Sequence, residues 1–236
     1  SGSGVPQDIE KAVILLAKSA DQGNRYAAYT LGKVYLDGRD MPINIEKALE
    51  LLTLSADKGF EAAEYVLGKL LCRGEQVPKD ITRAIDYLTK AASKGNQFAQ
   101  YLLGKLYLAG ENILKDSVQA IYWFSKSAEQ ENMYAEYALG KLYLYGRDAE
   151  KDYEKAITLL TVSAGHGNPY AALLLWNISK NKNWSFALGS VRLLIQIGRI
   201  FQNKLDDERK GKIGLVDKKI ISQINAKKAA HGIRQE

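Results

Sequence analysis

Few residues of this 236-residue chain have the type and spacing that metal binding requires. The two histidines, His166 and His231, are far apart in the sequence, and Cys72 is the single cysteine. A zinc site needs about four nitrogen, sulfur or carboxylate ligands, several of them closely spaced. His166 lies between two glycines, which predicts a turn residue, and Cys72 stands where other repeat copies have leucine. We therefore predict no metal site.

Three carboxylates, Glu46, Asp152 and Glu154, could in principle form an acid–base set. Equivalent acidic residues recur at multiples of 36 positions, however, each at the start of a predicted helix. There they serve as N-caps or interact favourably with the helix dipole. The sequence also lacks a glycine-rich phosphate loop and a nucleophile elbow. We expect no enzymatic activity, no cofactor and no small-molecule substrate.

The helices that position these residues are predicted from a sequence repeat with a period of 36 residues. A fixed period of this length is typical of a solenoid, in which stacked repeats share one core. Alanines keep the same interval, for example from Ala12 to Ala48 to Ala84. The dipeptide Leu-Gly marks each cycle, at Leu31-Gly32, Leu67-Gly68, Leu103-Gly104 and Leu139-Gly140.

Each repeat predicts two antiparallel helices. One type covers about 45–58 and its copies, and the other covers about 24–37, 60–73, 96–109 and 132–145. Ala27, Leu31 and Val34 follow helical spacing and are expected in the core. Glycine within a helix costs about 1 kcal/mol relative to alanine. Its recurrence in every Leu-Gly pair therefore predicts close backbone approach between helices.

Three segments carry the repeat pattern most clearly: Val77–Asp80, Ala120–Ala128 and Ala135–Gly146. They resemble the Sel1-like repeat family, a relative of the tetratricopeptide solenoids. The resemblance covers about residues 5–176. It implies an all-α, right-handed α/α solenoid that scaffolds protein–protein interactions. Accordingly we assign residues 5–180 to the solenoid, 181–208 to a C-terminal capping helix and 209–236 to a basic tail with a short helix.

The start of the chain matches the middle of a repeat, because Val5-Pro6-Gln7-Asp8 aligns with Val77-Pro78-Lys79-Asp80. Residues 1–4, Ser-Gly-Ser-Gly, resemble a remnant of cloning. We therefore expect the chain to be cut from a longer protein. At the other end, Leu175-Trp176 replaces Leu-Gly, as expected of a terminal repeat.

A tyrosine and a lysine four positions apart recur on the second helix type, where this spacing places both on one face. We call these pairs the Tyr–Lys ladder and expect it on the concave side, opposite the core. It could bind a protein or peptide, or nucleic acid, with the tyrosines as anchors. Alternatively, the tyrosines pack between repeats and the lysines are solvated. The pairs are Tyr29/Lys33, Tyr65/Lys69, Tyr101/Lys105 and Tyr137/Lys141.

Charge is unevenly distributed along the chain. Residues 177–236 contain 13 Lys and Arg against 5 Asp and Glu, whereas residues 1–176 contain 20 against 22. Such a basic tail suggests contact with DNA or another anionic partner, although a solvated surface is equally compatible with it. The candidate contacts are Lys218, Lys219, Lys227 and Lys228.

The tail carries a second resemblance. Ser190–Phe201 and Val216–Gly232 are similar to the C-terminal end of mobilisation relaxases of Gram-positive bacteria, some of which carry Sel1-like repeats. This implies an accessory module of a bacterial, cytoplasmic DNA-mobilisation protein. The histidine cluster and nucleophilic tyrosine of a relaxase nuclease are not in this chain. Our leading hypothesis is a non-catalytic protein-interaction scaffold. The alternative is a nucleic-acid-binding module that uses the tail and the ladder.

Overall fold

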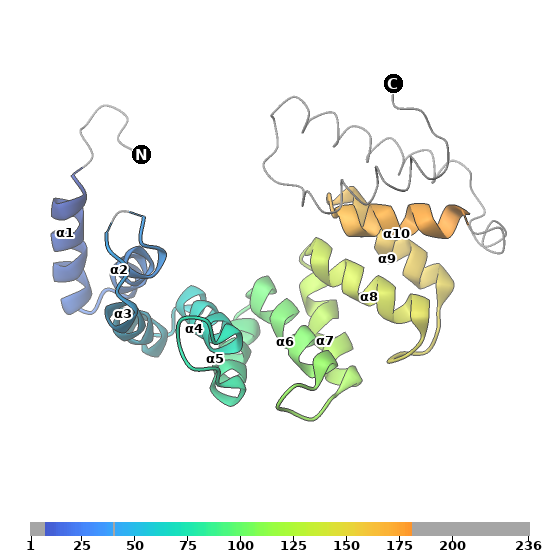
Figure 1. Cartoon of the computed structure of the whole chain (residues 1–236), viewed down its shortest axis with the longest axis horizontal. Coiled ribbons are helices and arrows are strands. Elements are labelled where there is room, and N and C mark those ends of the chain that lie inside the picture. The colour runs from blue at the N-terminus through green and yellow to red at the C-terminus, as the bar shows by residue number, and fades with distance from the viewer. Residues whose placement is uncertain (1–7, 40, 181–236) are drawn as a thin grey trace, which may run out of the picture. The chain divides into compact units, whose positions relative to one another are not determined.

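The computed structural model describes residues 8–39 and 41–180, which form ten α-helices (Figure 1). None of these helices is long and apolar enough to span a membrane. The odd-numbered helices are the first type predicted above, and the even-numbered helices are the second type. Their bounds are α1 Ile9–Asp21, α2 Arg25–Asp37, α3 Ile45–Asp57, α4 Glu61–Arg73, α5 Ile81–Ser93, α6 Gln97–Ala109, α7 Ser117–Ala128, α8 Met133–Tyr145, α9 Tyr153–Gly165 and α10 Pro169–Lys180.

The chain divides into two compact units, residues 1–123 and residues 124–236, each described by itself. In the first unit, α2 packs closely on α3, and α4 packs closely on α5. The second unit repeats this arrangement with α8 and α9. The all-α solenoid of 36-residue helix pairs is thus confirmed. The predicted capping helix at 181–208 and the basic tail at 209–236 lie outside the described residues.

Polar caps begin the helices where the sequence predicts them. The side chain of Asp80 accepts a hydrogen bond from the backbone N–H of Arg83 at 3.0 Å, and Asp152 caps α9 in the same way. The even helices α2, α6 and α8 use asparagine instead, as Asn96 accepts from Ala99 N–H at 2.9 Å, whereas α4 begins after Phe60 without a side-chain cap. Each cap satisfies a helix N–H that has no partner within the helix. These acidic residues are therefore structural, as their periodicity indicates.

Residues in the left-handed backbone conformation follow the ends of the helices. Gly38, Gly74, Gly110 and Gly146 cap the even helices with φ between 63° and 67°. After the odd helices, glycine takes the same region one residue beyond the cap, except after α7. There Glu131 adopts φ 61°. A side chain with a Cβ is strained in this conformation.

We expect Glu131→Gly to stabilise the protein by about 1 kcal/mol, because glycine relieves the strain at positive φ. The measurement is the midpoint of urea unfolding, followed by far-UV circular dichroism. Gly95→Ala is the reverse test: Gly95 has φ 95°, and nothing lies within 4 Å of an added methyl carbon. It should lose about as much. Equal effects of the two substitutions in the same direction would contradict this account.

The close joint within each pair is formed by the mid-helix glycine and a leucine. A methyl carbon added at Gly68 would lie 2.6 Å from Cγ of Leu88 and 3.1 Å from the carbonyl oxygen of Ala84. The same relation holds at Gly32 with Leu52 and at Gly140 with Leu160. These leucines are fully buried. Glycine is therefore required because a helix backbone packs directly on a leucine side chain.

Most of the predicted core is confirmed. Ala27 and Leu31 are buried, whereas Val34 is half-buried, and Leu36 takes its place in the core. Trp123 is also half-buried and packs at the margin of the cluster around Leu88. Trp176, at the Leu-Gly position of α10, lies under the ammonium of Lys180 at 3.9 Å from the ring centroid.

Candidate interaction surface

The Tyr–Lys ladder brings each lysine over the tyrosine four residues before it, in three of its four copies. The distance from Nζ to the ring centroid is 5.7 Å for Lys69 over Tyr65. It is 5.9 Å for Lys105 over Tyr101 and 5.4 Å for Lys141 over Tyr137. These are cation–π distances. In the first copy, Lys33 instead donates to the carboxylate of Asp37 at 3.0 Å, and both line a small hollow with Tyr29.

Tyr29, Tyr65 and Tyr137 pack against the core and not opposite it, as the alternative predicts, whereas the position of the ladder on the concave side stays a prediction. Tyr29 is half-buried and packs edge-to-face on Phe60 of the next repeat, with ring centroids 5.0 Å apart. The rings of Tyr65 and Phe98 are tilted to each other with centroids 6.0 Å apart, and those of Tyr137 and Tyr170 are tilted with centroids 6.2 Å apart. The side chain of tyrosine is long enough to reach an aromatic residue of the following repeat. Tyr29, Tyr65 and Tyr137 therefore pack between repeats, and the last two also have the ladder lysine over their rings.

Like charges gather around the second ladder pair. Partial burial lowers the pKa of Lys69, and the neighbouring cations Arg73 and Lys33 lower it further. Burial also raises the pKa of the Tyr65 hydroxyl, against the opposing effect of Arg73. A cation that loses water and faces other cations destabilises the folded state. An anionic partner would remove that cost, which makes this part of the ladder a candidate binding surface.

We expect Lys69→Met to raise the melting temperature by about 1–3 °C at neutral pH, because the variant keeps the stem but removes the charge. The folded-state pKa of Lys69 is below its unfolded value. Its unfavourable contribution is therefore present at neutral pH and disappears as pH rises to the unfolded pKa. The advantage of the variant should shrink from about pH 7 to about pH 11. A difference in melting temperature that does not depend on pH would contradict this assignment.

Two buried glutamates were not found from the sequence. Glu64 is 2% exposed, and its Oε1 accepts a hydrogen bond from Nζ of Lys94 at 2.6 Å. Its Oε2 is buried without a hydrogen-bond partner in the described structure. Glu136 is 3% exposed and lies 2.9 Å from Nδ1 of His166. His166 is a turn residue, as predicted, but it also forms this contact between repeats.

The signal for these pairs is their spacing in the repeat. Glu64 and Glu136 occupy equivalent positions, and each is followed 30 residues later by a basic residue. Gln100 stands between them in the array and is also buried, donating from Nε2 to the carbonyl oxygen of Ala92 at 3.0 Å. Buried polar groups need such partners because they lose their hydration. The pairs explain packing between repeats, and neither has a cleft or a third group that would suggest catalysis.

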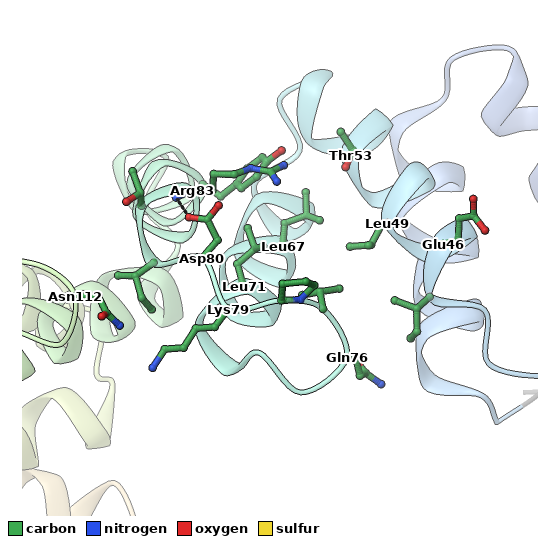
Figure 2. A pocket seen from close by; sticks show the side chains of 16 residues that line it. Glu46, Leu49, Thr53, Leu67, Leu71, Gln76, Lys79, Asp80, Arg83 and Asn112 are labelled. Atoms are coloured by element: carbon green, nitrogen blue, oxygen red, sulfur yellow. Dashed lines mark hydrogen bonds between the residues drawn. The ribbon is translucent and has the colours of Figure 1, made fainter.

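A cleft of about 900 Å³ lies between α3 and α5 in the first unit (Figure 2). Leu49 from α3 and Leu67 and Leu71 from α4 line it with apolar groups, and Lys79 and Arg83 line it with cations (Figure 2). Glu46 and Asp80 also line the cleft, and Asp80 is occupied as the N-cap of α5 (Figure 2). Cys72 is half-buried nearby, and burial raises the pKa of its thiol. This suits the apolar role predicted for Cys72 and makes it a poor nucleophile.

Within residues 8–39 and 41–180, no group of three or more histidine, cysteine or acidic side chains could hold a metal ion. His231 and the proposed tail contacts at Lys218, Lys219, Lys227 and Lys228 lie outside the described residues. The ladder is therefore the predicted site that the structure describes, and its role in partner binding stays a prediction.

Comparison with known proteins agrees with the repeat geometry. The Sel1 repeat profile matches residues 1–24, 25–60, 61–96, 97–132 and 134–168. Each complete match covers an even helix and the odd helix that follows it in the sequence. No curated protein matches the chain significantly.

Solved structures give similar folds. The chain is 28% identical to c5321, a protective antigen of uropathogenic Escherichia coli strains, with a TM-score of 0.72. It is 36% identical to a Sel1 repeat protein from Oxalobacter formigenes, with a TM-score of 0.65. These matches cover 84% and 74% of this chain, but only 41% and 50% of the respective relatives. Immunity protein Pa5087 from Pseudomonas aeruginosa is 24% identical, with a TM-score of 0.51 and coverage of 86% and 77%, which shows a shared fold.

Proposed function

Since the chain belongs to the Sel1 repeat family, we propose that it is a non-catalytic scaffold that binds an acidic segment of a partner protein. The segment would lie along the Tyr–Lys ladder. The observation that carries this proposal is the environment of Lys69, a partly buried cation beside Arg73 and Lys33. A residue kept at a cost to stability on a surface is typical of a binding site.

The ladder suits a carboxylate-bearing segment for two reasons. First, its lysines recur once per repeat, so an extended partner would meet cations at regular intervals within the first unit. Second, the tyrosines beneath Lys69 and Lys105 offer aromatic surface, and Tyr65 is held against Phe98, so it should lose little entropy on binding. Lys33 is already paired with Asp37 and should contribute less.

Binding of a fluorescein-labelled peptide of alternating glutamate and alanine tests this proposal by fluorescence anisotropy. The double variant Lys69→Ala/Lys105→Ala should bind at least about tenfold more weakly than the unmodified chain. Lys18→Ala/Lys90→Ala removes the same charge from exposed lysines outside the ladder, so it controls for net charge. It should change binding by less than about twofold. Equal losses in both variants would reject the ladder as the site.

We also propose, from the sequence of the tail alone, that this chain is part of a bacterial mobilisation relaxase and that it is cytoplasmic. The antigen, the Oxalobacter protein and the immunity protein lend it no support. Nucleic-acid binding is the second candidate function, favoured by the basic composition of residues 177–236. It predicts affinity for duplex or single-stranded DNA that falls steeply with salt. Replacing Lys218, Lys219, Lys227 and Lys228 by alanine should abolish such binding, and no binding at low salt would reject it.

A further inference from the structure

Helix α7 carries an exposed apolar patch that helices α3, α5 and α9 lack. Leu114, in the loop ahead of α7, is 90% exposed, and Val118 and Tyr122, one turn apart on the helix, are 76% and 49% exposed. We call these three residues the α7 patch. At the positions of Val118 and Tyr122, the other three helices have Glu46 and Glu50, Thr82 and Asp86, and Glu154 and Thr158. The patch is therefore a property of this repeat and is not required by the stacking of helices.

The cleft between α3 and α5 offers apolar surface in the same unit. Ile45, Leu49 and Tyr87 line it and are half-buried, so part of each side chain stays accessible. Its volume of about 900 Å³ lies in the range of pockets that take up a ligand. Its charged lining consists of two acidic and two basic side chains, Glu46, Asp80, Lys79 and Arg83. The net charge of the cleft therefore favours neither an acidic nor a basic occupant.

The repeat places the α7 patch and the cleft on one face of the first unit. Pro78 and Thr82 line the cleft. Their counterparts 36 positions later are Leu114 and Val118 of the patch. Equivalent positions of stacked repeats point to the same side of the array. Asn112, two residues ahead of Leu114, also lines the cleft (Figure 2). The two apolar surfaces are therefore neighbours that face the same side.

We infer that this face binds a second copy of the chain, with the α7 patch of each copy seated in the cleft of the other. Two neighbouring, complementary surfaces on one face meet reciprocally when the second copy is related by a two-fold axis, the commonest symmetry of protein dimers. Both apolar surfaces then lose water in one step, and such burial drives most protein association. A helical segment of an unrelated protein would fill the cleft and leave the patch in water.

The charges beside the two surfaces permit this pairing. Lys115 is exposed next to Leu114, and Glu46 is exposed on the α3 side of the cleft. Two docked copies would thus hold opposite charges at the edges of the apolar contacts, which favours correct docking. An acidic segment of another protein, by contrast, would gain no net attraction from a cleft whose charges cancel.

Sedimentation of the full chain over a range of concentrations tests the inference. The chain should dimerise with a dissociation constant in about the micromolar range. Val118→Glu places on α7 the residue that α3 and α9 have at this position, so the repeat should still fold. It should weaken the dimer at least about tenfold, because a carboxylate would enter an apolar cleft. Val162→Glu is the matched control: Val162 is 42% exposed on α9, outside both surfaces, and its replacement should change the dissociation constant less than about twofold.

Cross-linking then identifies which surfaces meet. Cys72→Leu removes the native cysteine and restores the leucine that other copies have there. In this background, one chain carries Val118→Cys and a second carries Glu46→Cys. A short bismaleimide should cross-link a mixture of the two chains in several-fold higher yield than either chain alone. Equal yield from the Val118→Cys chain alone would overturn the inference, since patch would then meet patch.

A chain that stays monomeric would also overturn the inference. The reactivity of the Val118→Cys thiol towards maleimide then separates the remaining occupants. Slow reaction would point to residues 181–236 of the same chain, and fast reaction would leave the α7 patch open to another protein. Equal weakening by Val118→Glu and Val162→Glu would assign the effect to net charge and reject the patch. The peptide test of the ladder uses other residues, so either result can fail alone.

Discussion

Replacing Gly68 by valine is expected to destabilise the protein by about 3 kcal/mol, and we expect the midpoint of urea unfolding to fall accordingly. Even the first carbon of the new side chain would lie 2.6 Å from Leu88 Cγ and 3.1 Å from the backbone oxygen of Ala84. The leucine is fully buried and the oxygen belongs to a helix, so neither can move far. The helices α4 and α5 must therefore separate.

Gly165→Val is the matched control for this experiment. Gly165 is the last residue of α9, is exposed, and has nothing within 4 Å of an added methyl carbon. The same change of residue should there alter stability by less than about 0.5 kcal/mol. If both variants lost the same stability, helix propensity or a denatured-state effect would explain the loss, and the close joint would have no special role.

Replacing Lys94 by methionine is expected to cost about 3 kcal/mol, which makes it the second large effect. Glu64 would remain in a site where it is 2% exposed, without its ion-pair partner. Lys94 also donates to the carbonyl oxygen of Gly59 at 3.1 Å, and this bond between repeats would be lost as well. Unfolding in urea measures the difference from the unmodified chain.

Two further variants show whether the buried charge causes this loss. Adding Glu64→Gln to Lys94→Met should recover about half of it, because a neutral amide is less costly to bury. Gln100 shows that the repeat accommodates glutamine at this position, bonded to the carbonyl oxygen of Ala92. Lys126→Met breaks an exposed ion pair with Glu129 and should cost less than about 1 kcal/mol. A double variant less stable than Lys94→Met alone would contradict the explanation.

The repeat made most of the fold predictable. Residue types recur at intervals of 36 positions, so a pattern that arises by chance in one repeat is not found in the others. The predicted caps, helix ends and mid-helix glycines all agree on the same helix boundaries. The prediction of close approach at Leu-Gly is confirmed at Gly32, Gly68 and Gly140. Helix spacing also placed Ala27 and Leu31 in the core correctly.

Contacts between repeats were harder to predict, since they depend on how far a side chain reaches. Helical spacing places Tyr29 and Lys33 on one face but does not show that Tyr29 extends to Phe60. Likewise, a glutamate in a helix usually indicates a solvated surface, and Glu64 is buried only because Lys94 comes from the next repeat. The spacing of 30 positions between a glutamate and a basic residue, as in Glu64 and Lys94, could have predicted these pairs. It differs from the 36-residue period and is therefore easily missed.

The serines of two close joints, between α2 and α3 and between α8 and α9, have a consequence for how this architecture can diversify. Ser55 and Ser163 each donate a hydrogen bond to the backbone carbonyl of the first residue of the preceding helix. That residue is Arg25 in one case and Met133 in the other. The hydrogen bond therefore does not depend on the side chain at this position. Substitutions at that residue leave the hydrogen bond intact. Surface residues of one repeat can therefore change independently of its neighbours, and a new binding specificity can arise while the stacking of the array is retained.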